Sequence, residues 1–251
     1  MAFLAGFSIL QIEMCFPALI EPFFGKNNTT WAITLTVIMI GFFLGYKIGG
    51  TLTDKNHKLE VPILIISGIW LITITLLTKP IAYLILSSFE QNTFFQIDFT
   101  FLIGTLITAI LFALIPTSIL ASLEPYLIKK STKSKNTIGQ NTSNIFFFTT
   151  LGSLTGLFSC TYLLIPFIGS KTTLCLLGST LLLLGIIKKK EPLYIKIEIF
   201  LLCLCLTLFC TTLGIHGKQN IHTQIQNKKR NLNWQEKIIF EKESIYQYIQ
   251  I

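Results

Sequence analysis

The chain has 251 residues, of which 51% are hydrophobic and only 13% are charged, and its mean hydropathy is +0.65. Soluble domains carry about 25% charged residues, so this composition excludes an ordinary soluble protein and predicts an integral membrane protein. The formal net charge of +8 does not indicate nucleic-acid binding, because the basic residues lie in short segments between apolar runs, where they orient membrane helices.

The first apolar run covers residues 2–20, with no basic segment before it and no A-x-A-like cleavage site after it. We therefore expect a retained helix and not a signal peptide. Glu13 lies inside this run. Because an ionisable side chain is costly to place in lipid, Glu13 is a candidate for function, and structural pairing is the alternative.

The second run, residues 31–54, combines signals of length and of packing. It is nearly uncharged, and at 1.5 Å per residue it is long enough to cross a hydrocarbon core of about 30 Å. Gly41, Gly45 and Gly49 recur every four residues, so they share one helical face on which a second helix can approach closely. We expect this face to pack against the helix that carries Glu13.

The third run, residues 61–78, is uncharged and just long enough to span. Lys79-Pro80 is expected to end this helix. The short apolar segment 81–89 is then expected to lie at the membrane interface or to pack as a half-helix.

The fourth run, residues 99–123, contains Pro116 and is followed directly by Glu124 and Pro125. Each proline removes a backbone donor and clashes with the preceding turn, which predicts a kinked or broken helix end. The lysine-rich segment 129–144 that follows is expected to be a solvated loop.

Three further apolar runs complete the predicted bundle. Residues 145–168 carry Gly152 and Gly156, again four residues apart, which indicates a second packing face. Residues 172–187 form the shortest run, and residues 194–215 form the last.

The predicted fold is an all-α polytopic membrane protein. Residues 1–215 form a bundle of about seven transmembrane helices, or six if the short run 172–187 does not cross, and residues 216–251 form a basic polar tail with one β-strand over 238–251. The lysines predicted on the side of the N-terminus are Lys47, Lys55, Lys58, Lys129, Lys130, Lys133, Lys135, Lys188, Lys189, Lys190 and Lys196, and those predicted on the opposite side are Lys26, Lys79 and Lys171. This imbalance predicts a cytoplasmic N-terminus in a bacterial inner membrane. Seven spans would send the basic tail outside, and six would keep it inside.

The cysteines and histidines show no metal-binding spacing. All six cysteines lie in apolar runs, where cysteine behaves as a small hydrophobic residue, and the histidines are scattered over loops and tail. We expect no metal, no cofactor and no catalytic cluster. The residues concerned are Cys15, Cys160, Cys175, Cys203, Cys205, Cys210, His57, His216 and His222.

Several motifs in order resemble one family, the membrane proteins in which a transporter-like helical half is fused to a spermidine-synthase-like domain. The glycine ladder of the second run is also similar to the turn after the second helix of major-facilitator transporters. The chain departs from the family pattern at Thr149, Lys47 and Glu124. The motifs are Phe3 to Phe7 with Glu13, Gly41 to Gly50 ending in Leu52-Thr53-Asp54-Lys55, Ile115-Pro116-Thr117 with Pro125, and Thr150-Leu151-Gly152 to Gly156 with Pro166 and Gly169.

The end of the tail, residues 238–251, resembles the first strand of an aminopropyltransferase domain, and an isolated amphipathic tail is the alternative. The resemblance implies that Gln247 contacts the thionucleoside part of the aminopropyl donor. The chain lacks the glycine-rich nucleoside-binding turn and the downstream proton-accepting aspartate. We therefore expect no catalysis by this chain alone, and it looks like the membrane half of a split or truncated gene.

The sequence leaves three functions open. The first is a non-catalytic membrane domain that anchors, or channels substrate for, a separate spermidine-synthase-like subunit. The second is a transporter-like protein for a small, cationic solute such as a polyamine, with Glu13 and Glu124 as ligands, since carboxylates suit ammonium groups. The third is a degenerate remnant without activity. Besides the lipid bilayer, the synthase-like subunit is the partner expected, and nucleic acid is not.

Overall fold

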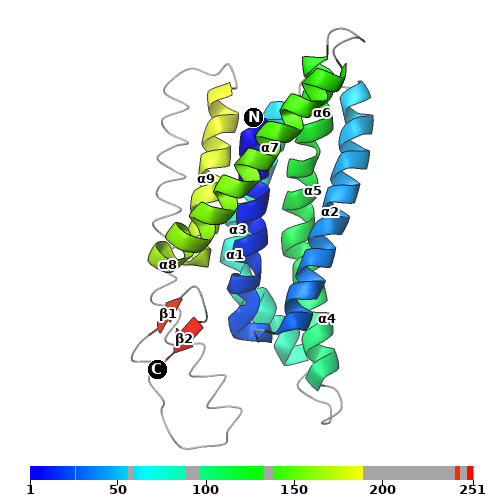
Figure 1. Cartoon of the computed structure of the whole chain (residues 1–251). Coiled ribbons are helices and arrows are strands. Elements are labelled where there is room, and N and C mark those ends of the chain that lie inside the picture. Colours follow the sequence, from blue (N-terminus) through cyan, green and yellow to red (C-terminus); the bar gives the residue numbers. More distant parts are fainter. Residues whose placement is uncertain are drawn as a thin grey trace, which may run out of the picture.

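A computed structural model of the chain describes residues 1–25, 27–55, 59–88, 97–132, 138–188, 241–243 and 248–250. Residues 1–188 of this set are almost entirely helical. Six helical segments are long and apolar enough to cross a membrane, and the shortest of them, Ser170–Lys188, has 19 residues. The prediction of an all-α polytopic membrane bundle is therefore confirmed, with six spanning helices described (Figure 1).

Each of the first three spans and the last is one helix, whereas the fourth and fifth are built from consecutive helical pieces. The elements are α1 (Ala2–Phe24), α2 (Asn28–Lys55), α3 (Glu60–Ser88), then α4 (Ile97–Ala109), η2 (Ile110–Leu114), α5 (Ile115–Ala121) and α6 (Leu123–Ser131), then α7 (Ile138–Phe158), η4 (Ser159–Leu164) and α8 (Ile165–Ile168), and finally α9 (Ser170–Lys188).

Successive spans alternate in direction, so the bundle has two distinct ends. Gly25 and Gly169, with φ of 77° and 83°, connect α1 to α2 and α8 to α9 at one end, in a backbone conformation that favours glycine. At the other end α1, α3 and α7 begin, and α2, α6 and α9 end (Figure 1). We call this second end the N-terminal end of the bundle.

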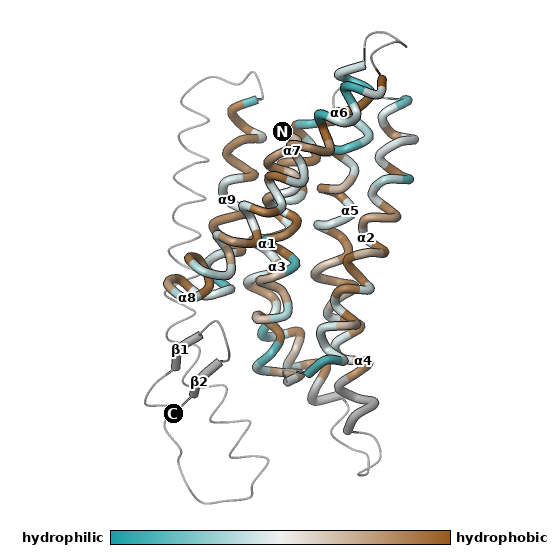
Figure 2. The backbone as a smooth tube through the Cα atoms, viewed as in Figure 1, coloured by the Kyte–Doolittle hydropathy of each residue, from teal (hydrophilic) through white to brown (hydrophobic). Residues whose placement is uncertain are grey.

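Hydropathy follows the bundle axis. Apolar residues dominate the middle of the helices, and hydrophilic residues gather toward the two ends (Figure 2). The outer face of α7 is apolar as well, since Phe146, Phe147 and Phe148 are all exposed. Lipid tails are as apolar as these side chains, so an exposed phenylalanine face is what a membrane helix presents to the bilayer.

The core is centred on α1. Its buried side chains Ile9 and Ile12 pack in one cluster with Leu64 of α3, Leu120 of α5 and Leu181 of α9, all of them at most 1% exposed. Glu13, the next residue along α1, is only half-buried beside this cluster.

The glycine ladder of α2 packs against α5 and the residue after it, and not against α1 as expected. A Cβ added to Gly49 would lie 2.6 Å from the Cα of Ser122, and one added to Gly45 would lie 2.7 Å from the Cβ of Ala121. A Cβ on Gly41 would overlap the hydroxyl of Thr117. The expected partner is wrong because α5 presents its own small residues to this face, which lets the two backbones approach.

The helix α1 makes its closest approach to α7 instead. A Cβ on Gly152 would overlap the carbonyl oxygen of Phe3, and one on Gly156 would lie 2.5 Å from the carbonyl oxygen of Phe7. From the other side, a Cβ on Gly6 would overlap the carbonyl oxygen of Thr149. Three glycines thus allow two backbones to touch, because no side chain separates them.

Two expected boundaries are wrong. Pro80 does not end the third helix, because α3 continues to Ser88, and residues 81–88 therefore belong to α3 and not to a separate interfacial piece. Ala82, fully buried, packs in a core cluster with Phe24, and this packing offsets the missing hydrogen bond of the proline. The expected loop 129–144 is also mostly helical, because α6 extends to Ser131 and α7 begins at Ile138.

The fourth run was predicted to have a kinked or broken helix end, and its α-helix is indeed broken. The π-helical segment η2 ends two residues before Pro116, and a second interruption at Ser122 separates α5 from α6. A π-helical turn absorbs the hydrogen-bonding defect that a proline introduces into the ladder.

Beyond the bundle the structure describes two short strands, β1 (Glu241–Glu243) and β2 (Tyr248–Gln250), which pair antiparallel with Lys242 opposite Ile249. The single strand expected over 238–251 is not confirmed. The seventh apolar run, residues 194–215, lies outside the described residues, and so does Gln247.

Candidate functional site

The most unusual charged residue of the bundle is Glu124, at the start of α6. It lies within a spanning segment, where charge is rare, and only 5% of its surface is exposed. The group that interacts with its carboxyl is the hydroxyl of Tyr46 on α2. The close packing of Gly49 on Ser122 brings α2 and α6 together at this level, because Ser122 directly precedes α6. The glycine ladder therefore positions the Tyr46–Glu124 pair.

Glu13, the second predicted carboxylate, is half-buried on α1. It makes no hydrogen bond or ion pair with any described residue. At 1.5 Å per residue Glu13 lies about 17 Å from the start of α1, whereas Glu124 lies about 10 Å from the end of α6. Both distances are measured from the N-terminal end, so the two carboxylates occupy different depths.

The structure does not bring the predicted site residues into one contact group. Glu124 pairs with Tyr46, and no interaction joins it to Glu13 within the described residues. Gln247 lies outside the described part of the chain. In the described ranges, no group of three or more His, Cys, Asp and Glu side chains is placed to hold a metal ion.

A charged cluster at the N-terminal end was missed by the sequence analysis. The carboxylate of Glu60, at the start of α3, accepts hydrogen bonds from Lys130 at 2.5 Å and from Lys188 at 2.6 Å. Asp54 at the end of α2 pairs with Lys129 at 2.7 Å. These contacts connect the ends of α2, α3, α6 and α9.

The chain terminus belongs to the same neighbourhood. Burial lowers the pKa of the Met1 amino group, and the positive charge of Lys188 lowers it further, while Glu60 opposes both. The Met1 amino group therefore lies close enough to the Glu60 cluster to experience its field.

Glu60 could have been recognised from the sequence. It is an acidic residue directly before an apolar run, and a carboxylate at a helix N-terminus interacts favourably with the helix dipole. The lysines that meet it, Lys130 and Lys188, lie in the last turns of their helices, where positive charge is favoured.

Together, fold and charged residues define the class of the protein: a polytopic helical membrane protein with carboxylates inside its bundle and a cluster of ion pairs at one end. No protein-family model, no curated protein and no solved structure matches this chain. The class therefore depends on the residues and geometry described above.

Proposed function

We propose that the bundle is transporter-like and binds a small cationic solute, with Glu124 as its anionic ligand. The contrast between two buried acidic residues supports this proposal. Glu60 is neutralised by two lysines, whereas Glu124 has only the uncharged phenol of Tyr46 as a described partner. A buried carboxylate without a compensating cation is costly in a membrane and is therefore a functional candidate.

The chemistry around Glu124 suits an ammonium group. A carboxylate forms strong charge-assisted hydrogen bonds with an ammonium donor, and the aromatic ring of Tyr46 adds a face that attracts cations. Glu13, deeper along the bundle and without a described partner, offers a second carboxylate to a solute with more than one positive charge, such as a polyamine.

Loss of the Glu124 charge is expected to reduce uptake of labelled spermidine into vesicles by about tenfold or more, because a hydrogen bond to a charged group contributes about 1.5–3 kcal/mol. The variant is Glu124→Gln, which keeps the size of the side chain. Asp54→Asn is the matched control, since Asp54 is an exposed carboxylate near the same end, and its uptake should stay within about twofold of wild type. Equal uptake by wild type and Glu124→Gln would remove Glu124 from the proposal.

A second candidate is a membrane domain that anchors, or channels substrate for, a spermidine-synthase-like subunit. One observation favours it: the resemblance of residues 238–251 to a synthase strand, although the structure describes two short paired strands in that segment. Short paired strands have open edges to which a partner can add a strand. Deleting residues 216–251 distinguishes the two candidates. If the chain anchors a partner, the deletion should abolish capture of that partner in a pull-down. If the bundle is a transporter, the deletion should leave uptake unchanged.

For orientation, the excess of lysine at the N-terminal end supports a proposal that this end faces the cytoplasm, in a bacterial inner membrane. With six spans, the chain leaves α9 on the same side as the N-terminus.

A further inference from the structure

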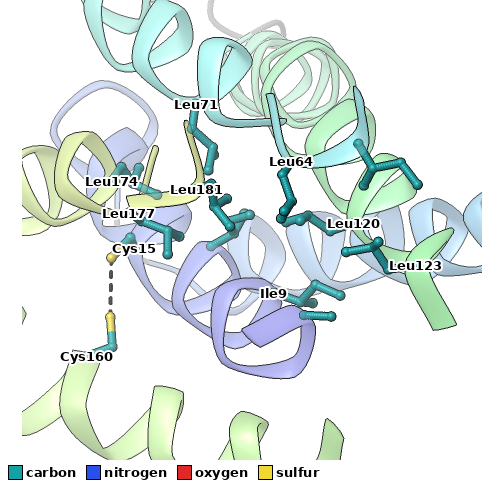
Figure 3. Close-up of a cluster of buried hydrophobic side chains, with 13 residues drawn as sticks. Ile9, Cys15, Leu64, Leu71, Leu120, Leu123, Cys160, Leu174, Leu177 and Leu181 are labelled. Carbon is teal, nitrogen blue, oxygen red and sulfur yellow. Dashed lines mark hydrogen bonds between the residues drawn. The ribbon is translucent and has the colours of Figure 1, made fainter. Parts of the chain in front are cut away.

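Two buried thiols lie in contact in the interior of the bundle. The Sγ atoms of Cys15 and Cys160 are 3.2 Å apart, and both residues are 0% exposed. Figure 3 shows the two side chains pointing toward each other from α1 and from the fifth span. In the sequence they are 145 residues apart, so a covalent bond between them would join two distant helices.

The surroundings hold the two sulfur atoms in place. Cys15 and Cys160 belong to the main core cluster, and Leu174 and Leu177 of α9 lie near Cys15 (Figure 3). The thiol of Cys160 also lies 3.9 Å from the carbonyl oxygen of Gln11, one turn before Cys15 on α1. This packing keeps the two sulfur atoms close to each other.

The backbone at Cys160 is itself unusual. Cys160 lies in η4, where the α-helical ladder of the fifth span gives way to π-helical hydrogen bonding. Single π-helical turns within α-helices occur frequently at functional sites. The cysteine pair lies on the same interface as the glycine contacts between α1 and α7. Along this interface Gly152 contacts Phe3, Gly156 contacts Phe7, and Cys160 contacts Cys15.

We propose that Cys15 and Cys160 form a reversible disulfide that fixes α1 to the fifth span. In the oxidising step the two S–H bonds break, one S–S bond forms, and two protons and two electrons pass to a lipid-soluble quinone, which becomes the quinol. A dithiol reductant reverses the step by thiol–disulfide exchange, in which its own two thiols become a disulfide.

The position of the pair accounts for the choice of oxidant. Both thiols are buried among leucine side chains in a membrane-spanning bundle, where a water-soluble oxidoreductase cannot make contact. A small apolar oxidant that dissolves in the lipid is the class that we assign to this step, and it requires a local opening of the bundle because both thiols are fully buried. The pair is therefore expected to respond to the redox state of the membrane.

Oxidation of the wild-type chain in vesicles with decylubiquinone is the experiment that tests the proposal. After alkylation of remaining thiols and digestion, mass spectrometry should detect a peptide containing Cys15 linked to one containing Cys160, and a dithiol added beforehand should abolish that species. At least half of the chains should carry the link after oxidation. If Cys15 and Cys160 are fully alkylated after oxidation, the proposal is wrong.

Two variants serve as controls, one for loss of folding and one for the identity of the linked cysteines. Cys15→Ser should lose the linked peptide while keeping the elution volume of the folded chain in detergent. Cys175→Ser, which removes another buried thiol, should keep the Cys15–Cys160 link. Loss of the link in Cys175→Ser with folding intact, or a linked pair that does not contain both Cys15 and Cys160, would also overturn the assignment.

Discussion

Gly152→Leu is expected to lower the stability of the bundle by about 3 kcal/mol, the upper part of the range for overpacked cores. Even a Cβ at this position would overlap the carbonyl oxygen of Phe3. Because the obstructing atom belongs to the backbone of α1, no side-chain rotation can relieve the overlap. The two helices must separate, and the contacts of α1 with α7 are lost.

Gly139→Leu is the matched control for this variant. Gly139 lies on the same helix, and nothing is within 4 Å of a Cβ added there. Thermal unfolding in detergent, followed by the exposure of a thiol-reactive dye, measures both variants. If Gly152→Leu unfolds at the same temperature as Gly139→Leu, the close contact between α1 and α7 is refuted.

Glu60→Gln is expected to destabilise the N-terminal end of the bundle by about 1–2 kcal/mol. Removing one partner of a buried ion pair costs about 3–5 kcal/mol; here the loss is smaller because the Lys130 side chain is 56% exposed and water screens its charge. The variant leaves Lys130 and Lys188 near each other with no carboxylate between them. The resulting repulsion should be weaker at high salt, so added salt should restore part of the lost stability.

Asp54→Asn provides the comparison, since the carboxylate of Asp54 is 76% exposed where it meets Lys129. An exposed pair contributes about 0–1 kcal/mol, so this variant should differ little from wild type. The same thermal unfolding series, at low and high salt, measures both variants. Equal destabilisation by Glu60→Gln and Asp54→Asn would contradict the distinct role given to Glu60.

The positions of the spanning helices could be predicted from the sequence because a membrane imposes a simple length requirement. A helix must present about 20 apolar residues to cross, and the runs that begin at residues 2, 31, 61, 99, 145 and 172 each correspond to a described span. The short run 172–187 is part of α9, and α9 as a whole is long and apolar enough to cross.

Helix ends were predicted less well, because they depend on residues far away in the sequence. Lys129 and Lys130 look like loop residues when only their neighbours are considered. They are helical in the structure because Asp54 and Glu60 supply carboxylates across the bundle. Similarly, α3 continues past Pro80 because Ala82 packs in a core that the local sequence does not reveal.

The glycine faces could be identified from spacing, but their partners could not. Spacing by four residues shows that Gly41, Gly45 and Gly49 share a face, and says nothing of which helix meets that face. A usable signal was present in α5, where Thr117 and Ala121 also offer small side chains at helical spacing. Pairing small-residue faces with each other would have favoured α5 over α1 as the partner of α2.

The candidate site was predicted in part. Glu13 and Glu124 stand out because ionisable residues are rare within apolar runs. Their different depths, and the pairing of Glu124 with Tyr46, required the three-dimensional arrangement. Glu60 was overlooked because it lies at the edge of an apolar run, where charge is ordinary.

The central structural claim is that the described residues up to Lys188 form a bundle of six crossing helices, with the N-terminus and the end of α9 on one side. The most direct test places single accessible cysteines, in a background without the native cysteines, after residues 1, 26, 57, 92, 134, 169 and 190, and labels them from each side of sealed vesicles. The sites after residues 1, 57, 134 and 190 should label from one side, and the sites after residues 26, 92 and 169 from the other. Any two neighbouring sites that label from the same side would show that the helix between them does not cross, and would contradict the six-span bundle.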